Sequence, residues 1–170
     1  MSYDPVIIGQ FKELECKYNL ENYILIYAYD LRFNEKKYIE KIRHYARKKD
    51  LKIYSVGYYQ TWCDKNIYPE PKDIFEWFLK AQYIITDTFH GTIFSMRSHK
   101  KFVTIVRDSN SNKLEDLIKK CGMQDRIVSN AENLVYVMEK EIDYSKFEQL
   151  RKFAKEKTDL YLEKCINGGK

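Results

Sequence analysis

The segment YIITDTFHGTIFS, residues 83–95, decides the fold class that this chain is predicted to have. Its apolar beginning is typical of a short buried strand over residues 83–86. The residues after Thr88 are typical of a helix, so His90 and Gly91 fall on the first turn of a helix that directly follows a strand. Ligands of open α/β sheets bind at this place, beyond the carboxyl ends of the strands. The N–H groups at a helix start suit a phosphate or carboxylate, so the segment predicts an anion site.

The sequence on both sides of this segment alternates predicted strands and predicted helices. Strands are predicted at residues 23–29, 51–57, 83–86, 101–106 and 126–129. Helices are predicted at residues 34–49 with Asn34 as the cap, at 71–81, after Thr88, at 114–121 with Gly122 as the stop, and at 145–166. This alternation indicates right-handed βαβ units. The predicted fold is therefore α/β: a Rossmann-like three-layer domain with a mostly parallel sheet of about four to six strands and a long C-terminal helix.

A single domain is predicted over residues 1–170, because no linker and no internal repeat interrupts the pattern. Residues 1–22 are predicted to be an entry segment, where residues 11–18 have the pattern of a short helix. Residues 23–142 form the predicted βα core, in which residues 58–72 are a loop. Residues 145–167 form the predicted C-terminal helix.

The composition indicates a globular protein with a charged surface. Of the 170 residues, 30 are Lys or Arg and 25 are Asp or Glu, which gives a net charge of +5. These charges are scattered, so a solvated surface explains them, and we expect no nucleic-acid partner. No apolar run approaches the roughly 18 residues that a membrane span requires, and no signal peptide is recognisable. A cytoplasmic location is expected, with the inner face of the membrane as an open alternative.

The cysteines and the known short motifs exclude several kinds of site. The four cysteines lie far apart, and no CxxC pair and no histidine at metal-ligand spacing accompanies them. Neither a zinc site nor a disulfide framework is therefore expected. Cys121 and Cys165 fall on apolar helical stripes and are predicted to be packing residues. The chain has no GxGxxG and no GxxxxGK[ST], which excludes the dinucleotide fingerprint and the P-loop. No metal and no cofactor are expected.

The segment TDTFHGTIFS, followed by the predicted strand KFVTIV, resembles the polysaccharide pyruvyl transferase family. The order of the other segments strengthens the resemblance, since YILIYAY and YSVGYY precede it and KLEDLIKKCGMQDRIV and a terminal helix follow it. The opening residues 4–8 resemble the segment just before the family's C-terminal domain. The resemblance covers nearly the whole chain. It implies the C-terminal half of a two-domain, GT-B-like enzyme whose N-terminal domain is missing from this sequence.

The resemblance also implies an activity. Members of the family transfer an enolpyruvyl-derived group from phosphoenolpyruvate to a sugar hydroxyl and so make a pyruvate ketal, in the biosynthesis of cell-surface polysaccharide. Phosphoenolpyruvate is then the donor substrate rather than a cofactor, and the acceptor is a saccharide or a lipid-linked saccharide. By itself this half is expected to bind phosphoenolpyruvate weakly and to be inactive, because the acceptor contacts belong to the missing half.

The family's His-Gly pair corresponds to His90 and Gly91, and the resemblance makes His90 the catalytic residue in contact with the donor phosphate. In some branches of the family an Arg and a Leu precede this histidine, where this chain has Thr88 and Phe89. A second basic position of the family, often Arg, is Lys113 in this chain. An imidazole can donate a hydrogen bond to phosphate and can carry a proton at physiological pH.

The residues around His90 give the further substrate-binding candidates. Thr88 is predicted to cap the helix so that the N–H groups of Gly91 and Thr92 remain open to an anion. Gly91 also lets the backbone approach a ligand closely. The complete set of substrate-binding candidates is Thr88, Gly91, Thr92, Arg107, Lys113, Tyr58 and Asp87.

Each candidate has a purely structural alternative. Asp87 is either an acid or a capping and supporting carboxylate, and Tyr58 either contacts the ligand or covers the core. Arg107 and Lys113 are either ligand contacts or solvated charges. Two other functions also stay open for the chain as a whole. One is the donor domain of a GT-B nucleotide-sugar glycosyltransferase, and the other is a non-catalytic module that binds a glycan or polyanion.

Overall fold

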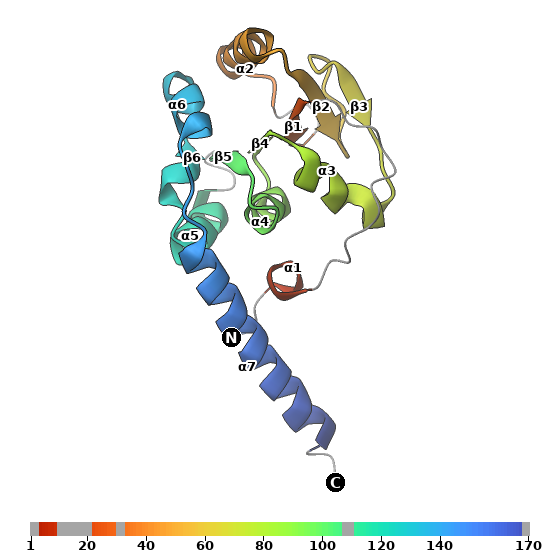
Figure 1. Ribbon diagram of the computed structural model, residues 1–170, viewed down its shortest axis with the longest axis vertical. Helices are drawn as coiled ribbons and strands as arrows, with labels where there is room; N and C mark the ends of the chain where they lie inside the picture. The colour runs from red at the N-terminus through yellow and green to blue at the C-terminus, as the bar shows by residue number, and fades with distance from the viewer. Residues whose placement is uncertain (1–3, 10–21, 30–32, 107–110, 168–170) are drawn as a thin grey trace.

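The computed structural model describes residues 4–9, 22–29, 33–106 and 111–167. Its centre is a six-stranded sheet in the order β3-β2-β1-β4-β5-β6 (Figure 1), and every pair of neighbouring strands is parallel. The strands are β1 (Tyr23–Tyr27), β2 (Lys52–Val56), β3 (Lys65–Ile67), β4 (Tyr83–Thr86), β5 (Lys101–Ile105) and β6 (Ile127–Val128). The predicted α/β class is confirmed, and the carboxyl ends of all these strands lie at one edge of the sheet.

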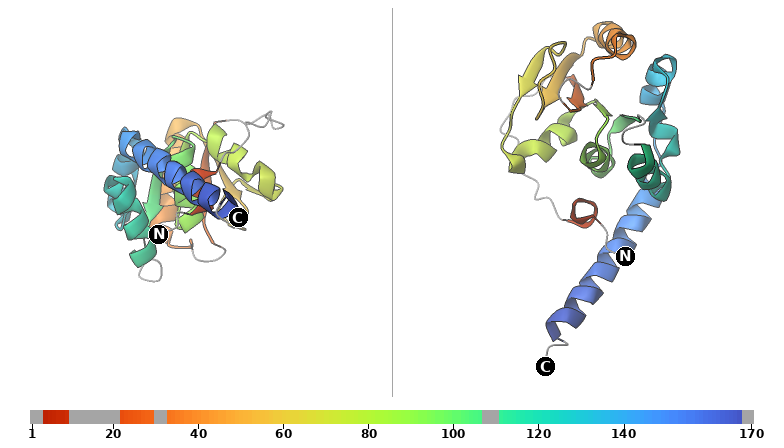
Figure 2. Two further views of the ribbon diagram at one scale, coloured as in Figure 1. Left: turned by 90° about the horizontal axis from the view of Figure 1, so that it is seen from below. Right: turned by 180° about the vertical axis from the view of Figure 1, so that it is seen from behind.

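Helices cover both faces of the sheet, which gives three layers (Figures 1 and 2). The α-helices are α1 (Pro5–Ile8), α2 (Lys36–Lys49), α3 (Ile74–Lys80), α4 (Phe89–Arg97), α5 (Ser111–Cys121), α6 (Leu134–Glu139) and α7 (Ser145–Asn167). Short 3-10 turns lie at Pro71–Asp73, Gln124–Arg126 and Ala131–Asn133. The buried side chains of α2 and α6 pack on one face, and those of α1, α3, α4, α5 and α7 pack on the other.

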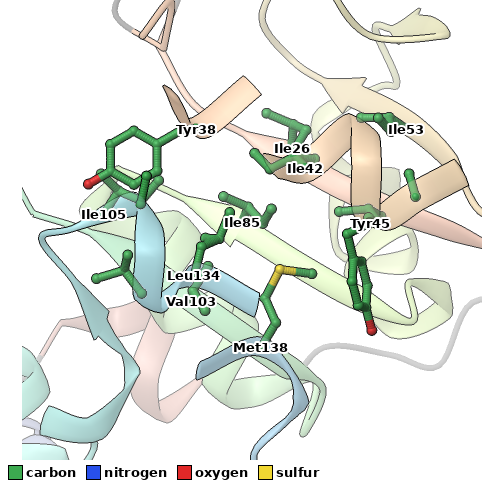
Figure 3. Packing of buried hydrophobic residues seen from close by; sticks show 14 of the residues in the cluster. Ile26, Tyr38, Ile42, Tyr45, Ile53, Ile85, Val103, Ile105, Leu134 and Met138 are labelled. Atoms are coloured by element: carbon green, nitrogen blue, oxygen red, sulfur yellow. The ribbon is translucent and has the colours of Figure 1, made fainter. Parts of the chain in front are cut away.

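The strands are apolar on both faces because each face is covered by helices. In β1 the side chains of Ile24 and Ile26 belong to the cluster under α2 and α6, whereas Tyr23 and Leu25 belong to the cluster on the opposite face. Figure 3 shows the first of these clusters, in which side chains of the strands meet those of α2 and α6. The strand pattern that predicted buried parallel strands is thus explained by this packing.

Four local features differ from the prediction. β3 lies inside the segment 58–72 that was predicted to be a loop, because its three residues, Lys-Asn-Ile, carry too little apolar pattern to signal an edge strand. α6 was not predicted either, and its six residues are too few to give a helical period. α2 begins after Glu35 rather than Asn34. The entry segment contains α1, while the helix predicted at residues 11–18 lies outside the described residues.

α7 has 23 residues, and only its first half packs on the domain. Phe147 and Ala154 are fully buried, whereas the helix beyond them extends away from the sheet (Figures 1 and 2). Cys165 lies in this second half and is exposed, so its predicted role in packing is wrong within this chain, whereas Cys121 is buried as predicted. None of the helices in the described ranges has the length and apolar character that crossing a membrane would require.

Glu139, at the end of α6, provides a prediction about pH. Tyr45 donates a hydrogen bond of 2.5 Å to Glu139 Oε1, and Lys49 Nζ lies 3.0 Å from the same oxygen. These contacts hold the pKa of Glu139 below its ordinary value of 4.5, and the hydrogen bond from Tyr45 has the largest effect. A carboxyl group whose pKa is lower in the folded than in the unfolded state stabilises the fold at pH values above its unfolded-state pKa. This contribution is lost as the pH falls through its folded-state pKa. Glu139→Gln is therefore expected to lower stability at neutral pH.

The difference between Glu139→Gln and the unaltered chain should close as the pH falls below 4.5. Urea unfolding at about pH 7 and about pH 3 measures it. Glu156→Gln, at an exposed position of α7, is the control and should leave the unfolding midpoint unchanged at both pH values. A Glu139→Gln deficit of equal size at both pH values would contradict the prediction.

Candidate functional site

The site predicted from the sequence lies where β4 ends and α4 begins, at the carboxyl edge of the sheet. Thr88 is the N-cap of α4, and its Oγ1 accepts a hydrogen bond of 2.9 Å from the N–H of Gly91. Thr86 fixes the turn from the strand side, since its Oγ1 donates to the carbonyl of Tyr27 at 2.6 Å and accepts from the N–H of Thr88 at 3.1 Å. The predicted helix start is therefore confirmed, and buried threonines hold it in place.

The N–H groups that were predicted to be open to an anion are not open. The N–H of Gly91 is bonded to Thr88 Oγ1, and the N–H of Thr92 is bonded to the Thr88 carbonyl at 3.0 Å. Thr88 uses both groups: its side chain accepts from Gly91, as an N-cap does, and its carbonyl accepts the first intrahelical bond, from Thr92. The N–H groups of Phe89 and His90 come earlier in the helix and have no acceptor inside it. A ligand at this helix start would therefore meet Phe89 and His90 rather than the next turn.

Gly91 and Thr92 are both buried. An added Cβ at Gly91 would lie 2.2 Å from Thr86 Oγ1, 2.6 Å from Thr88 Oγ1 and 2.7 Å from Tyr27 Cδ1. The absence of a side chain at Gly91 thus lets α4 pack closely against the sheet. Thr92 donates its hydroxyl to the Thr88 carbonyl at 2.9 Å, so its side chain also serves the fold.

His90 is the exposed member of the turn, with 57% of its side-chain surface accessible. Its Nε2 lies 3.6 Å from Oδ2 of Asp4, the residue that caps α1. The ring of Phe89 meets the ring of His90 edge to face, with centroids 5.6 Å apart. An accessible imidazole at a helix start is able to bind an anion and to exchange a proton with it.

Lys113 is brought to the same turn. It lies on α5, which follows β5, and its Nζ is 4.3 Å from the centre of the Phe89 ring. Phe89 thus contacts both Lys113 and His90, so a lysine ammonium group accompanies the imidazole at the start of α4. Arg107, the other predicted cation, lies outside the described residues and stays a prediction.

Asp87 and Tyr58 lie at this edge of the sheet too, in contact with β1 and the residues after it. Asp87 is buried, and its Oδ1 accepts from the N–H of Tyr29 at 3.4 Å, which is the place of a supporting carboxylate. Tyr58 is partly buried and meets the rings of Tyr27 and Tyr29 edge to face. Burial raises the pKa of Tyr27, and the neighbouring hydroxyls of Tyr58 and Tyr29 raise it further.

Three of the residues around this turn could not be recognised as site residues from the sequence. In the sequence, Phe89 stands out only as a departure from the family pattern, and Tyr27 only as part of a predicted strand. Asp4 was placed in the entry segment, although Asp followed by Pro is a recognisable helix start, with a capping carboxylate and proline in the first turn. That signal could have predicted α1, but not that α1 lies against His90.

Trp62 and the other two histidines lie elsewhere or serve packing. Trp62 is partly buried, stacks on Phe33 and donates its indole N–H to the Phe33 carbonyl at 3.1 Å. His44 and His99 are exposed, and His99 Nε2 lies 2.9 Å from Glu148 Oε1. Within the described part of the chain, no group of three or more His, Cys, Asp and Glu side chains is arranged to hold a metal ion.

The fold and this turn define a Rossmann-like α/β domain with an exposed histidine and a lysine at the carboxyl edge of its sheet. The chain belongs to the polysaccharide pyruvyl transferase family, whose model matches residues 4–109. The matched range contains Asp4, α4 and His90 but ends before Lys113, so it is shorter than the resemblance seen in the sequence. No curated protein and no solved structure matches the chain significantly.

Proposed function

We propose that this chain is the donor-binding part of a polysaccharide pyruvyl transferase and that it binds phosphoenolpyruvate at the amino end of α4. The observation that carries the proposal is the accessible imidazole of His90 on the first turn of α4, in a chain of this family. The donor carries a phosphate and a carboxylate, and the N–H groups of Phe89 and His90 suit either of them. Lys113 adds a positive charge beside the same turn.

The chemistry gives each of these groups a task. A proton is delivered to the methylene carbon of phosphoenolpyruvate, which creates an oxocarbenium-like centre at the neighbouring carbon. A sugar hydroxyl adds to this centre and loses its proton, and phosphate departs with the electrons of its C–O bond. A second hydroxyl of the sugar then adds to the same carbon and loses its proton, which closes the ketal. His90 and Lys113 stabilise the charge of the departing phosphate by hydrogen bonding and Coulomb attraction. Arg107 is proposed as a further contact to the donor.

The rest of the proposal concerns the whole enzyme. The acceptor is a saccharide or a lipid-linked saccharide, and its contacts belong to an N-terminal domain that faces this one across a cleft, as in GT-B enzymes. The exposed apolar side chains on the last turns of α7 support this view, since they suit packing against another domain: Leu160, Tyr161, Leu162 and Ile166. The sequence of the complete gene tests it, because the proposal requires an upstream segment with its own alternation of strands and helices.

The test of donor binding is an NMR titration of the chain with phosphoenolpyruvate. Weak binding is expected, with shifts centred on Phe89, His90 and Gly91, because this chain is proposed to supply only the donor side of the cleft. His90→Ala should weaken binding at least about tenfold, since it removes a charge-assisted hydrogen bond to the phosphate. His44→Ala, at an exposed histidine of α2, is the matched control and should leave the affinity unchanged.

Two parallel titrations separate the alternatives. A uridine diphosphate sugar that shifts the same residues, while phosphoenolpyruvate does not, would replace the proposal with a nucleotide-sugar glycosyltransferase. An oligosaccharide that binds alone, with unchanged affinity in His90→Ala, would indicate a glycan-binding module. Phosphoenolpyruvate shifts that persist in His90→Ala would place the donor somewhere other than the start of α4.

A further inference from the structure

α1 is held against α4 at its first residue. Asp4 caps α1, because its Oδ1 accepts a hydrogen bond of 2.9 Å from the N–H of Val6. The second carboxylate oxygen, Oδ2, lies 3.6 Å from His90 Nε2. The Asp4 carboxylate thus caps α1 with one oxygen and faces His90 with the other.

The other end of α1 is also fixed to α4. Arg97 Nη1 donates to the carbonyls of Ile7 at 2.8 Å and of Gly9 at 2.7 Å. His90 and Arg97 stand two helical turns apart, so both project from the same side of α4. The side chain of Ile7 is buried in the core, and α1 contacts both α4 and α7 (Figure 2).

These contacts fix the position of the Asp4 carboxylate before any ligand arrives. The cap to Val6 determines which oxygen faces the ring, and the Arg97 contacts keep α1 from sliding along α4. Among the ion pairs of the described residues, Asp4 is the acidic partner of His90. A separation of 3.6 Å places the Asp4 carboxylate within ion-pair range of the His90 ring.

We infer that Asp4 is the positioning residue of His90: it holds the Nε2 side of the ring and leaves Nδ1 as the nitrogen that meets an anionic ligand. A carboxylate beside one imidazole nitrogen orients the ring, while the other nitrogen acts on the substrate. The identity of the ligand as phosphoenolpyruvate rests on the proposed function. The pairing of Asp4 with His90 and the choice of ring nitrogen do not depend on it.

The first test needs no ligand. The ring nitrogens of His90 are followed by NMR at neutral pH in the 170-residue chain labelled with ¹⁵N-histidine. Asp4→Asn keeps the cap of α1, because Asn and Asp are equally good N-caps, and removes only the charge. The Nε2 and Nδ1 signals of His90 are expected to move in Asp4→Asn while the backbone signals of Val6–Ile8 stay in place.

The chain offers a matched control for this measurement. His99, just after the end of α4, and Glu148, on α7, form a second histidine–carboxylate pair with 2.9 Å between Nε2 and Oε1. Glu148→Gln should move the ring signals of His99 and leave those of His90 unchanged. Unmoved His90 signals in Asp4→Asn would overturn the inference. If the signals of Val6–Ile8 also move, Asp4→Glu must restore the His90 ring signals, and failure to do so overturns it as well.

The second test adds phosphoenolpyruvate. Its binding should shift Nδ1 of His90 more than Nε2 and leave α1 docked, and Asp4→Asn should weaken the affinity by about two- to fivefold. A ligand that shifts chiefly Nε2 and releases α1 would show that it displaces Asp4, and the inference would be wrong. If the unaltered chain does not bind phosphoenolpyruvate, the proposed function fails, while the ligand-free ring signals still decide the role of Asp4.

Discussion

Replacing Gly91 with alanine is expected to destabilise the domain by about 2 kcal/mol net, the largest loss that a single added methyl group should cause near the site. The new Cβ would stand 2.2 Å from Thr86 Oγ1, 2.6 Å from Thr88 Oγ1 and 2.7 Å from Tyr27 Cδ1. These atoms cannot withdraw easily, because Thr86 Oγ1 is bonded to the Tyr27 carbonyl and Thr88 Oγ1 caps the helix. Overpacking costs about 3 kcal/mol here, and the better helix propensity of alanine returns about 1 kcal/mol.

Urea unfolding measures this loss, and the neighbouring position supplies the control. His90→Ala introduces the same side chain one residue earlier on the same helical turn, but at an exposed position. It should change stability by no more than about 1 kcal/mol, since an exposed ion pair is weak and alanine favours the helix. The two variants should thus separate: Gly91→Ala affects mainly stability, and His90→Ala affects mainly binding. A Gly91→Ala chain as stable as the unaltered one would contradict the packing that holds α4 to the sheet.

The second large effect is expected at Arg126, in the part of the chain beyond the matched family range. Its side chain is fully buried and donates from Nη1 to the carbonyls of Val137 at 2.9 Å and Lys140 at 3.2 Å. Arg126→Met fills similar space but leaves these carbonyl groups at the end of α6 without their donor. The expected loss of stability is about 3 kcal/mol, because unpaired buried polar groups are costly.

A variant of Asp125 distinguishes the contribution of the ion pair from that of the contacts to the carbonyl groups. It lies 3.0 Å from Arg126 Nη2, but 42% of its side chain is exposed, so water can replace it. Asp125→Asn should therefore cost less than about 1 kcal/mol in the same unfolding measurement. Equal losses for Asp125→Asn and Arg126→Met would show that the ion pair, rather than the contacts to α6, is what Arg126 contributes. A loss at Arg126 would also show that the residues after 109 belong to the same folding unit.

The candidate site could be predicted in part. The apolar run before Thr86, the capping threonine and the position of His90 are local features, and the structure has the helix start and the exposed histidine where the sequence placed them. The use of the N–H groups was predicted wrongly, because the sequence does not say whether a cap side chain turns toward the helix or leaves room for a ligand. The contact of Lys113 with Phe89 was also beyond prediction, since it depends on how α5 lies beside α4.

The same division holds for the fold. The strands β1, β2, β4 and β5 and the long helices follow from periodicity, while β3 and α6 are too short to produce a period of their own. Their structure comes from neighbours: β3 pairs with the edge of β2, and α6 packs over β5. Short elements of this kind are stabilised by tertiary contacts more than by propensity.

The sequence by itself determined the alternation of strands and helices, the parallel sheet and a histidine at a helix start, because side-chain period and capping chemistry act between residues close in the chain. The tertiary structure alone decided that Asp4 faces His90, that Arg97 holds the end of α1, and that Gly91 is needed for packing. These contacts join residues far apart in the sequence. They form only when α1, α4 and the sheet bury their apolar surfaces together, and no local pattern specifies that arrangement.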